Sequence, residues 1–407
     1  MANKKIGILR ETKSPPDRRV PLTPSQIVKL QCKYPDVEFV VQPSEIRCYS
    51  DSEYEYLDIP LQEDLSDCDV LLGVKEIKKE TFIEGKKYMF FAHVAKKQEH
   101  NRAMFQEAAR KKISLIDYEY LTRDDTKRIV AFGRWAGIAG AYKGLRARGI
   151  RTDRFNLKSA HECHDLDEMW AGLKKINLKP GLKILITGEG RVAGGAMESL
   201  GQIDQLRKVS PEEFLTLNFD EPVVCQIGPG FYAKRKNGGT FNFQHFKIEP
   251  EAYETDFLRF TRVTDVLIAC HYWDTKSPRF FTLNDMRSKD FRISVIADVS
   301  CDINGAIPST IRPTTIEDSF YGFNPETGKE ETAFTRSGNV TVMAVDNLPG
   351  ELPRDSSSDF GNQLIENVID HLINNSNNQV ISRATILRNG ELTERYSYMK
   401  DYLEEES

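Results

Sequence analysis

The 407-residue sequence lacks the features of several protein classes. No apolar run approaches the roughly 20 residues that a membrane-spanning helix needs. The net charge of −5 gives no excess of positive charge, which argues against nucleic acid as the main partner. The seven cysteines are scattered and odd in number, with no Cys-x-x-Cys pair, so we expect reduced thiols. The first residues lack the apolar core of a secretion signal, and we expect a cytoplasmic protein.

The chain is long enough for two domains, and its pattern alternates between strands and helices. Short apolar runs predict strands at 5–10, 37–42, 69–74, 87–92, 113–116, 183–187, 265–269, 293–297 and 340–345. Helices are predicted at 97–111 and 360–374, and Thr23, Pro24 and Gln26 form the capping box of another. Asn389-Gly390 predicts a hairpin turn. This alternation is typical of an α/β fold with mostly parallel sheets.

The stretch 183–200 combines a strand, a glycine turn and the start of a helix. It fits the G-x-G-x-x-G/A pattern, in which small residues let the backbone approach the pyrophosphate of a dinucleotide. The start of the helix adds unpaired amides and the positive end of the helix dipole. The alternative is a tight turn that holds no ligand. The cofactor-binding candidates are Gly188, Gly190, Arg191, Val192 and Ala193.

Three positions after the glycine turn bear on the cofactor. An acidic residue about 20 positions beyond the first glycine would bind the ribose of NAD, but Lys208 stands there, beside Arg207. This basic pair slightly favours NADP over NAD. Asp298 and Asp346 follow predicted strands, where α/β sheets bind ligands, and are further cofactor-binding candidates.

Lys75, His93 and Glu119 follow three of the predicted strands of the first half. Because the carboxyl ends of parallel strands share one edge, these side chains are expected to gather there. A lysine beside apolar strands and a histidine both suit proton transfer near neutral pH. The alternative is that Lys75 is a solvated strand end and His93 a capping residue.

Further motifs suggest ligands or packing. The rigid guanidinium groups of Arg18, Arg19 and Arg128 suit the carboxylates of an acidic substrate, although each is singly more often a surface residue. The many small residues of 134–149 indicate a helix in close contact with another backbone, as where a helix crosses between domains. The run HECHD at 161–165 lacks metal-site spacing, so we expect no metal. The segment 231–246 is expected to be an irregular basic and aromatic loop.

These features together resemble the alanine dehydrogenase/transhydrogenase superfamily. Within it they resemble the lysine-forming saccharopine dehydrogenases, especially the lysine–2-oxoglutarate reductase half of bifunctional aminoadipic semialdehyde synthase. The stretches that carry the resemblance occur in the family's order: ETKSPPDRRVPLTP, LLGVKEI, FFAHVAKKQEHN, LIDYEYL, RIVAFGRWAGIAGA, ITGEGRVAGGA, YWDTKSPRFFT, IADVSCDINGAI, TTIEDSFYG and AVDNLPGELPRD. The length matches a reductase without the saccharopine-oxidising partner domain of the bifunctional enzymes.

The resemblance implies that the enzyme joins lysine to 2-oxoglutarate and reduces the imine with a nicotinamide cofactor to give saccharopine. Lys75 and His93 match the acid–base pair, and Arg19 and Arg128 match arginines that hold substrate carboxylates. Glu76 and Glu119 match acids near the amine, Asp17 stands where the yeast-type enzyme has a glutamate, and Asp346 matches an aspartate near the nicotinamide.

The resemblance also implies two Rossmann-like domains with the active site in a cleft between them. We expect residues 1–135 and 347–407 to form the substrate domain and residues 136–346 the dinucleotide-binding domain. The alternatives are an alanine dehydrogenase-type enzyme that uses ammonia, and a non-catalytic nucleotide-sensing protein. The sequence leaves NAD against NADP, the direction of the reaction and the oligomeric state open.

Overall fold

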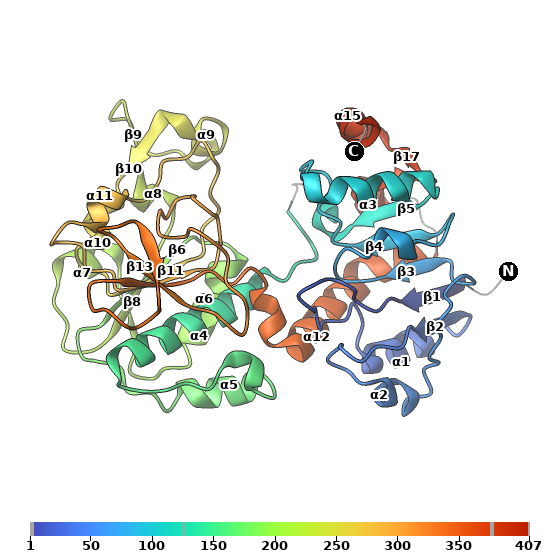
Figure 1. Ribbon diagram of the computed structural model, residues 1–407, viewed down its shortest axis with the longest axis horizontal. Helices are drawn as coiled ribbons and strands as arrows, with labels where there is room; N and C mark the ends of the chain where they lie inside the picture. Colours follow the sequence, from blue (N-terminus) through green and yellow to red (C-terminus); the bar gives the residue numbers. More distant parts are fainter. Residues whose placement is uncertain (1–3, 125–126, 375–377, 406–407) are drawn as a thin grey trace. The chain divides into compact units, whose positions relative to one another are not determined.

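The computed structural model describes residues 4–124, 127–374 and 378–405, and the chain divides into two compact units (Figure 1). Unit 1 comprises Met1–Phe132 and Pro353–Ser407, and unit 2 comprises Gly133–Leu352. Each unit has its own mostly parallel sheet and its own buried apolar residues. The predicted α/β fold class is confirmed. The assignment of substrate and cofactor to separate domains stays a prediction.

In the described part of unit 1, seven strands form one sheet in the order β17-β16-β5-β4-β3-β1-β2. They are β1 (Lys4–Ile8), β2 (Val37–Val41), β3 (Val70–Leu72), β4 (Lys87–Phe90), β5 (Ser114–Asp117), β16 (Thr385–Arg388) and β17 (Glu391–Leu392). β1 to β5 pair in parallel, so their carboxyl ends lie at one edge. β16 and β17 form the predicted hairpin, and both turn residues, Asn389 and Gly390, have positive φ.

The helices of unit 1 are α1 (Pro24–Lys33), α2 (Asp51–Glu55), η1 (Lys79–Thr81), α3 (Glu99–Arg110), η2 (Tyr118–Tyr120), α12 (Pro353–Leu364), the π-helical η6 (Ile365–Ile369), α13 (Asp370–Ile373), α14 (Gln379–Ala384), η7 (Glu394–Met399) and α15 (Lys400–Glu404). The capping box at the start of α1 is confirmed. The Thr23 hydroxyl accepts from the Gln26 amide, and the Gln26 side chain accepts from the Thr23 amide. The C-terminal helices pack on the first half, α12 against α1 and α15 against α3 (Figure 1).

Unit 2, all of whose residues are described, contains an eight-stranded sheet in the order β14-β13-β15-β12-β11-β6-β8-β7. These strands are β6 (Lys183–Thr187), β7 (Arg207–Lys208), β8 (Val223–Ile227), β11 (Val266–Ala269), β12 (Val295–Asp298), β13 (Tyr321–Asn324), β14 (Lys329–Glu331) and β15 (Val340–Met343). In this sheet β13 pairs antiparallel with both β14 and β15, and the other neighbouring strands pair in parallel. β9 (Ala233–Arg235) and β10 (Tyr253–Thr255) form a separate pair.

The helices of unit 2 are α4 (Gly133–Thr152), η3 (Ala160–Glu162), α5 (Leu166–Leu173), α6 (Arg191–Leu200), α7 (Pro211–Thr216), α8 (Pro229–Tyr232), α9 (Phe243–Ile248), η4 (Pro250–Ala252), α10 (Leu258–Thr261), α11 (Leu283–Met286) and η5 (Leu348–Glu351). The segment predicted to be an irregular loop instead contains β9 and the start of α9. The pairing of β9 with β10 gives this segment backbone order that its composition does not signal.

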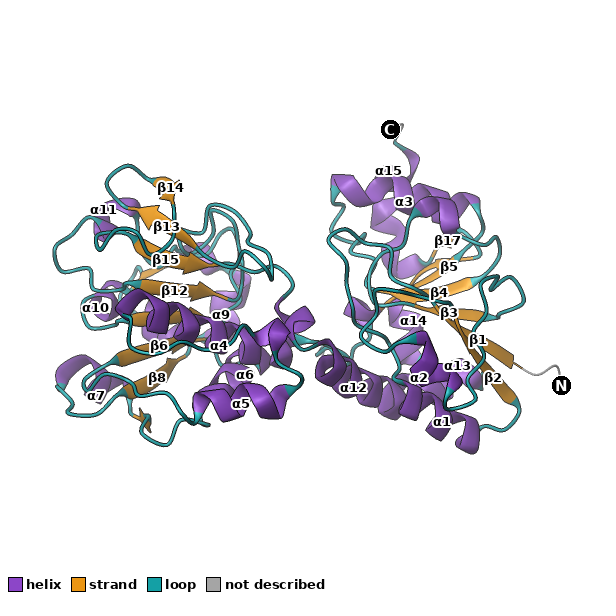
Figure 2. Ribbon diagram, turned by 60° about the horizontal axis from the view of Figure 1, so that its bottom comes forward, coloured by secondary structure: helices purple, strands orange, loops and turns teal. Residues whose placement is uncertain are grey.

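The small residues predicted to allow close backbone contact lie on α4, which packs against α6 (Figure 2). A Cβ on Gly137 would lie 1.8 Å from the carbonyl oxygen of Val192, and one on Gly195 would lie 2.0 Å from that of Arg134. The predicted close approach is therefore confirmed, and its partner is α6 within unit 2. Because α6 follows the glycine turn, this contact fixes the position of the turn.

Candidate functional site

The carboxyl edge of the unit 1 sheet carries the predicted acid–base residues. Lys75 and Glu76 follow β3, His93 follows β4 and Glu119 follows β5, and these three strands are neighbours. Nδ1 of His93 lies 3.7 Å from Oε2 of Glu76, whose Oε1 lies 2.7 Å from Nζ of Lys13. We call this edge, with Lys13, Lys75, Glu76, His93, Lys96, Glu119 and Arg128, the unit 1 rim.

The charges of the unit 1 rim shift the pKa values of its members. Burial, followed by the positive charges of Arg19 and Lys13, lowers the pKa of Lys75. Burial opposes the charged form of Glu76, but the neighbouring His93 and Lys13 outweigh it and lower its pKa to about 2. The rim therefore holds an ionised acid next to an amine that loses its proton more readily than an exposed lysine.

His93 is held by its backbone, which adopts a positive φ of 53° that is uncommon outside glycine. Its amide donates to Oδ2 of Asp117 over 3.2 Å, and its carbonyl accepts from the side chain of Asn101 over 3.4 Å. The ring stacks on Phe91, with centroids 6.0 Å apart. These contacts hold the ring beside Glu76, and the choice between an acid–base residue and a capping residue stays a prediction.

Glu119 carries the second group of charges at the unit 1 rim. Oε1 of this buried carboxylate forms an ion pair with Nη2 of Arg128 and lies 3.2 Å from Nζ of Lys96. Burial disfavours the charged form, but Arg128 and Lys96 outweigh it and lower the pKa of Glu119. Two residues predicted to bind different groups of the substrate thus bind each other in this structure.

Asp17 and Arg19, predicted to contact substrate, also pair with each other. Nη2 of Arg19 lies 2.6 Å from Oδ2 of Asp17, and its Nε donates to Oδ1 over 3.0 Å. The guanidinium group lies over the ring of Phe132, 4.2 Å from its centroid. Burial acts against the charge of Asp17, but Arg19 lowers its pKa well below the usual range. The substrate contacts predicted for this pair stay predictions.

Two buried carboxyl groups support the rim, and the sequence patterns did not single them out as site residues. Asp117 accepts from the amides of His93 and Glu119, so it joins the ends of β4 and β5. Burial and the charge of Glu119 raise its pKa to about 6. Glu11 accepts from the amides of Val74 and Lys75. The signal that could have found them is an acidic residue directly after an apolar strand at each position.

The glycine turn in unit 2 has the predicted strand–turn–helix form. Gly188 adopts a φ of 97°, and a Cβ there would lie 2.7 Å from the carbonyl oxygen of Cys270. α6 begins at Arg191 with Gly190 as N-cap, and no side chain caps it. Arg191 is exposed, Val192 is partly exposed and Ala193 is buried. Uncapped amides at the start of α6 suit an anion such as a pyrophosphate.

Lys208 lies on β7, which is not the neighbour of β6 in the unit 2 sheet. β8, not β7, lies next to β6, and Lys208 pairs with Val224, three residues before the end of β8 at Ile227. At about 3.3 Å per residue this places Lys208 roughly 10 Å short of the carboxyl edge. The spacing rule assumes that the second strand is the neighbour of the first, and this sheet does not meet that assumption. The assignment of Lys208 to the ribose stays a prediction, as does the slight preference for NADP.

The two aspartates predicted after strands differ in exposure. Asp298 is buried, and its oxygens accept from the hydroxyls of Ser300 and Thr310, each over 2.6 Å, and from the amide of Cys301 over 3.2 Å. These bonds make Asp298 a buried anchor of the loop after β12, and its role as a cofactor contact stays a prediction. Asp346 follows β15 and is exposed at the carboxyl edge. It remains a candidate.

The histidines of HECHD are engaged in ordinary polar contacts. The amide of His161 donates to Oε2 of Glu351 over 3.0 Å, and Oε1 of Glu351 lies 2.6 Å from Nζ of the buried Lys143. Nδ1 of His164 lies 3.0 Å from Oδ2 of Asp165. No group of three or more potential metal ligands is found among the described residues. The seven cysteines, all described, are free thiols.

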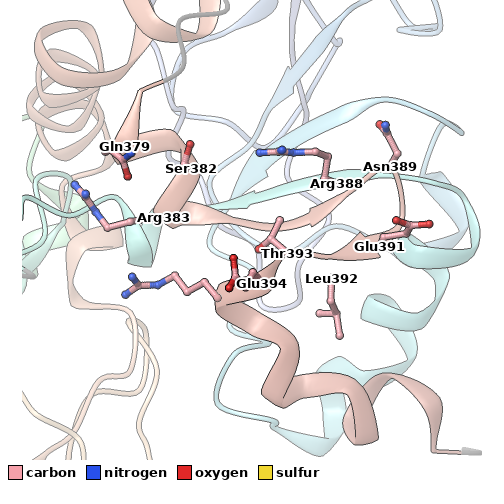
Figure 3. Close-up of a pocket in the computed structure, with 10 residues that line it drawn as sticks. Gln379, Ser382, Arg383, Arg388, Asn389, Glu391, Leu392, Thr393 and Glu394 are labelled. Carbon is pink, nitrogen blue, oxygen red and sulfur yellow. The ribbon is translucent and has the colours of Figure 1, made fainter.

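A groove of about 710 Å³ lies between α14, the β16–β17 hairpin and η7 (Figure 3). None of its lining residues belongs to the unit 1 rim. Arg383, Arg388 and Arg395 line it, together with Glu391 and Glu394. Arg383 already donates to the carbonyl of Thr122 over 2.5 Å, and the two carboxylates offset part of the arginine charge, so the groove is not simply basic. No helix in the described ranges is long and apolar enough to cross a bilayer.

Comparisons with known proteins identify relatives of this chain. The family model "Alanine dehydrogenase/PNT, N-terminal domain" matches residues 7–139, and "Alanine dehydrogenase/PNT, C-terminal domain" matches residues 251–399. An alpha-aminoadipic semialdehyde synthase of Arabidopsis thaliana is 29% identical over 98% of this chain and 41% of its own length. The chain thus spans less than half of that relative.

Two further matches cover whole proteins. A saccharopine dehydrogenase (NAD(+), L-lysine-forming) of Emericella nidulans is 26% identical over 91% of this chain and 92% of its own length. The solved structure of an L-alanine dehydrogenase superposes with a TM-score of 0.65 at 16% identity, over 98% of this chain and 99% of that one. The second match shows a shared fold.

Proposed function

We propose that this chain, which belongs to the alanine dehydrogenase/PNT family, interconverts lysine plus 2-oxoglutarate with saccharopine. It is an NAD(P)-dependent oxidoreductase of that family, and we infer its substrates from the acidic groups of the unit 1 rim. The lysine-forming saccharopine dehydrogenases, which match over about nine-tenths of both chains, support these substrates.

The observation that carries the proposal is a pair of buried carboxylate oxygens that make no hydrogen bond, although Nδ1 of His93 lies 3.7 Å from one of them, Oε2 of Glu76. Among the described residues, neither Oε2 of Glu76 nor Oε2 of Glu119 has a hydrogen-bond partner. A buried acceptor without a donor costs about 1–3 kcal/mol, so a ligand that brings N–H groups is favoured. Lysine and saccharopine each carry two nitrogens, whereas ammonia brings one small donor. Two such acceptors therefore suit a diamine-type substrate better than ammonia.

The lowered pKa of Lys75 suits the proton transfers of this reaction. The ε-amine of lysine attacks the ketone carbon of 2-oxoglutarate, and water leaves to form a C=N bond. Lys75 and His93 would accept the proton of the attacking amine and return a proton to the departing oxygen. A bound nicotinamide supplies the hydride that reduces the C=N bond. Ionised Glu76 and Glu119 would hold the amino groups of the substrate and balance their charge.

The two predicted arginines differ in their access to a substrate carboxylate. The side chain of Arg128 is 49% exposed, whereas that of Arg19 is 3% exposed and bonded to Asp17. We therefore assign carboxylate binding to Arg128 first, with Glu119 holding its guanidinium group in place. Arg19 and Asp17 contact substrate only if their mutual pair opens.

The glycine turn of unit 2 fits a dinucleotide. A Cβ on Gly190 would meet no atom within 4 Å, so the space above the turn is open. Gly188, Gly190 and the first amides of α6 would hold the pyrophosphate. Because Lys208 lies away from the carboxyl edge of the unit 2 sheet, the structure favours neither NAD nor NADP. The test therefore uses both cofactors.

The test is the oxidation of NADH and NADPH with lysine plus 2-oxoglutarate, compared with pyruvate plus ammonia. The proposal expects turnover in the first mixture and little in the second. Turnover with pyruvate and ammonia alone would identify an ammonia-using amino-acid dehydrogenase. Binding of a dinucleotide without turnover in either mixture would favour a nucleotide-sensing protein.

A matched pair of variants separates substrate binding from fold. Glu119→Gln is expected to raise the KM for lysine by about tenfold, because it removes a charge-assisted bond worth about 1.5–3 kcal/mol. Glu53→Gln is the control, since Glu53 also pairs with an arginine of unit 1, Nη2 of Arg354 at 2.8 Å. Equal effects of the two variants on the KM would contradict the assignment of Glu119.

A further inference from the structure

The carboxyl group of Glu11 completes the edge of the unit 1 sheet where Lys75 begins. The amide of Leu9 donates to the carbonyl of Leu72 over 2.9 Å, which is the last backbone bond between the chain after β1 and β3. Beyond it, Oε1 of Glu11 accepts from the amide of Val74 over 2.6 Å and Oε2 accepts from that of Lys75 over 2.9 Å. The Glu11 side chain thus accepts the two amide hydrogen bonds that the backbone carbonyls of a neighbouring strand would otherwise accept.

This contact is buried and specific. Glu11 is 5% exposed, so its carboxyl group shields the two amides from water. Each buried amide without a partner would cost about 1–3 kcal/mol, which makes the bidentate contact a strong local constraint. The constrained residue is Lys75 itself, whose side chain leaves the backbone at the bonded amide.

We propose that Glu11 is a positioning residue for Lys75, which fixes the backbone from which the acid–base amine extends and keeps that amine in its buried position. This inference rests on the proposed role of Lys75. It assigns Glu11 no contact with substrate or cofactor.

The groups that face Glu11 come from three segments. Asp17 and Arg19 lie in the loop after β1, Lys75 follows β3, and Tyr118 begins η2. Burial and the negative charge of Asp17 raise the pKa of Glu11 to about 8, against the two amides and Arg19, which favour its charged form. A neutral Glu11 adds no negative charge beside Lys75, and so leaves the lowered pKa of Lys75 undisturbed.

The experiment measures Lys75 directly, without substrates. The folded protein is labelled with a trace of acetic anhydride across a pH series, and mass spectrometry gives the acetylation midpoint of Lys75. The wild type is expected to show a midpoint below that of ordinary lysines. Glu11→Ala is expected to move the midpoint toward the ordinary value, because the released strand end exposes the amine.

Two further variants test whether the Lys75 midpoint depends on the Glu11 contact. Glu11→Gln retains one acceptor and is expected to give a midpoint between those of wild type and Glu11→Ala. Asp69→Asn is the matched control, because Oδ2 of Asp69 accepts from the amide of Lys5 over 2.8 Å at the other end of β3. An unchanged Lys75 midpoint in both Glu11 variants, or an equal shift in Asp69→Asn, would overturn the inference.

Kinetics separate this inference from the proposed function. Glu11→Ala is expected to lower kcat with the best substrates at least about tenfold while the Kd for the dinucleotide stays within about twofold, because misplaced catalytic groups lose turnover rather than remote binding. A wild type that turns over neither substrate mixture would contradict the proposed function. The acetylation midpoints would still decide the role of Glu11.

Discussion

At the scale of single residues, the unit 1 rim combines groups whose pKa values move in opposite directions. The pKa of Lys75 falls, that of Glu76 falls to about 2 and that of Glu11 rises to about 8. Such divergence within one site is typical of acid–base chemistry, although structural ion pairs also produce it.

The positions of Lys75, His93 and Glu119 after predicted strands predicted that they share an edge. They did not predict the pairs Asp17–Arg19 and Glu119–Arg128, because ion pairing depends on side-chain geometry.

Lys75→Met tests the acid–base assignment. The substitution keeps a flexible chain of similar length but removes the proton carrier, so kcat is expected to fall by about 10²-fold or more. The Kd for the dinucleotide, measured by calorimetry, is expected to stay within about twofold, because the glycine turn belongs to unit 2. An unchanged kcat would remove Lys75 from the reaction.

Glu11 also predicts how stability depends on pH. Its pKa is about 8 in the folded chain against an ordinary value of 4.5, so between these values the folded state holds a proton that the unfolded state releases. The contribution of Glu11 to the free energy of unfolding is therefore full below about pH 4.5 and is lost as the pH rises through 8. Urea unfolding across this range should show a steeper loss for the wild type than for Glu11→Gln. Parallel curves would contradict the raised pKa.

At the scale of elements, the contact between α4 and α6 decides where the glycine turn stands. The sequence predicted a close backbone contact for this helix, because many small residues along one helix favour the approach of another backbone, but it did not predict that the partner is α6. The two adjacent glycines of α6 provide a matched test. A Cβ on Gly195 would lie 2.0 Å from the carbonyl oxygen of Arg134, whereas one on Gly194 would meet nothing within 4 Å.

Gly195→Ala is expected to destabilise unit 2 by about 1–3 kcal/mol or more, because the new methyl group overpacks a contact between backbones. Gly194→Ala is expected to be neutral or to stabilise the helix by up to about 1 kcal/mol. Chemical unfolding of both variants measures the difference. Equal stability would mean that α4 and α6 do not approach each other closely.

At the scale of the whole molecule, local motifs predicted the two sheets and the dinucleotide turn but not the order of strands. The position of β7 outside β8 follows from the packing of the chain after α6, and no residue of the stretch 201–208 signals it. Lys208→Ala is therefore expected to leave the ratio of the Kd values for NADH and NADPH unchanged within about twofold. A selective loss of NADPH binding would restore Lys208 to the cofactor site.

The most direct test of the central claim follows the nitrogen of the amine. The protein is incubated with 2-oxoglutarate, NADH and NADPH, and lysine labelled with ¹⁵N at the ε position, and the products are analysed by mass spectrometry. The account predicts saccharopine that retains the ¹⁵N, formed by the wild type and strongly reduced in Lys75→Met. Dinucleotide oxidation that requires added ammonia, with no labelled saccharopine, would contradict it.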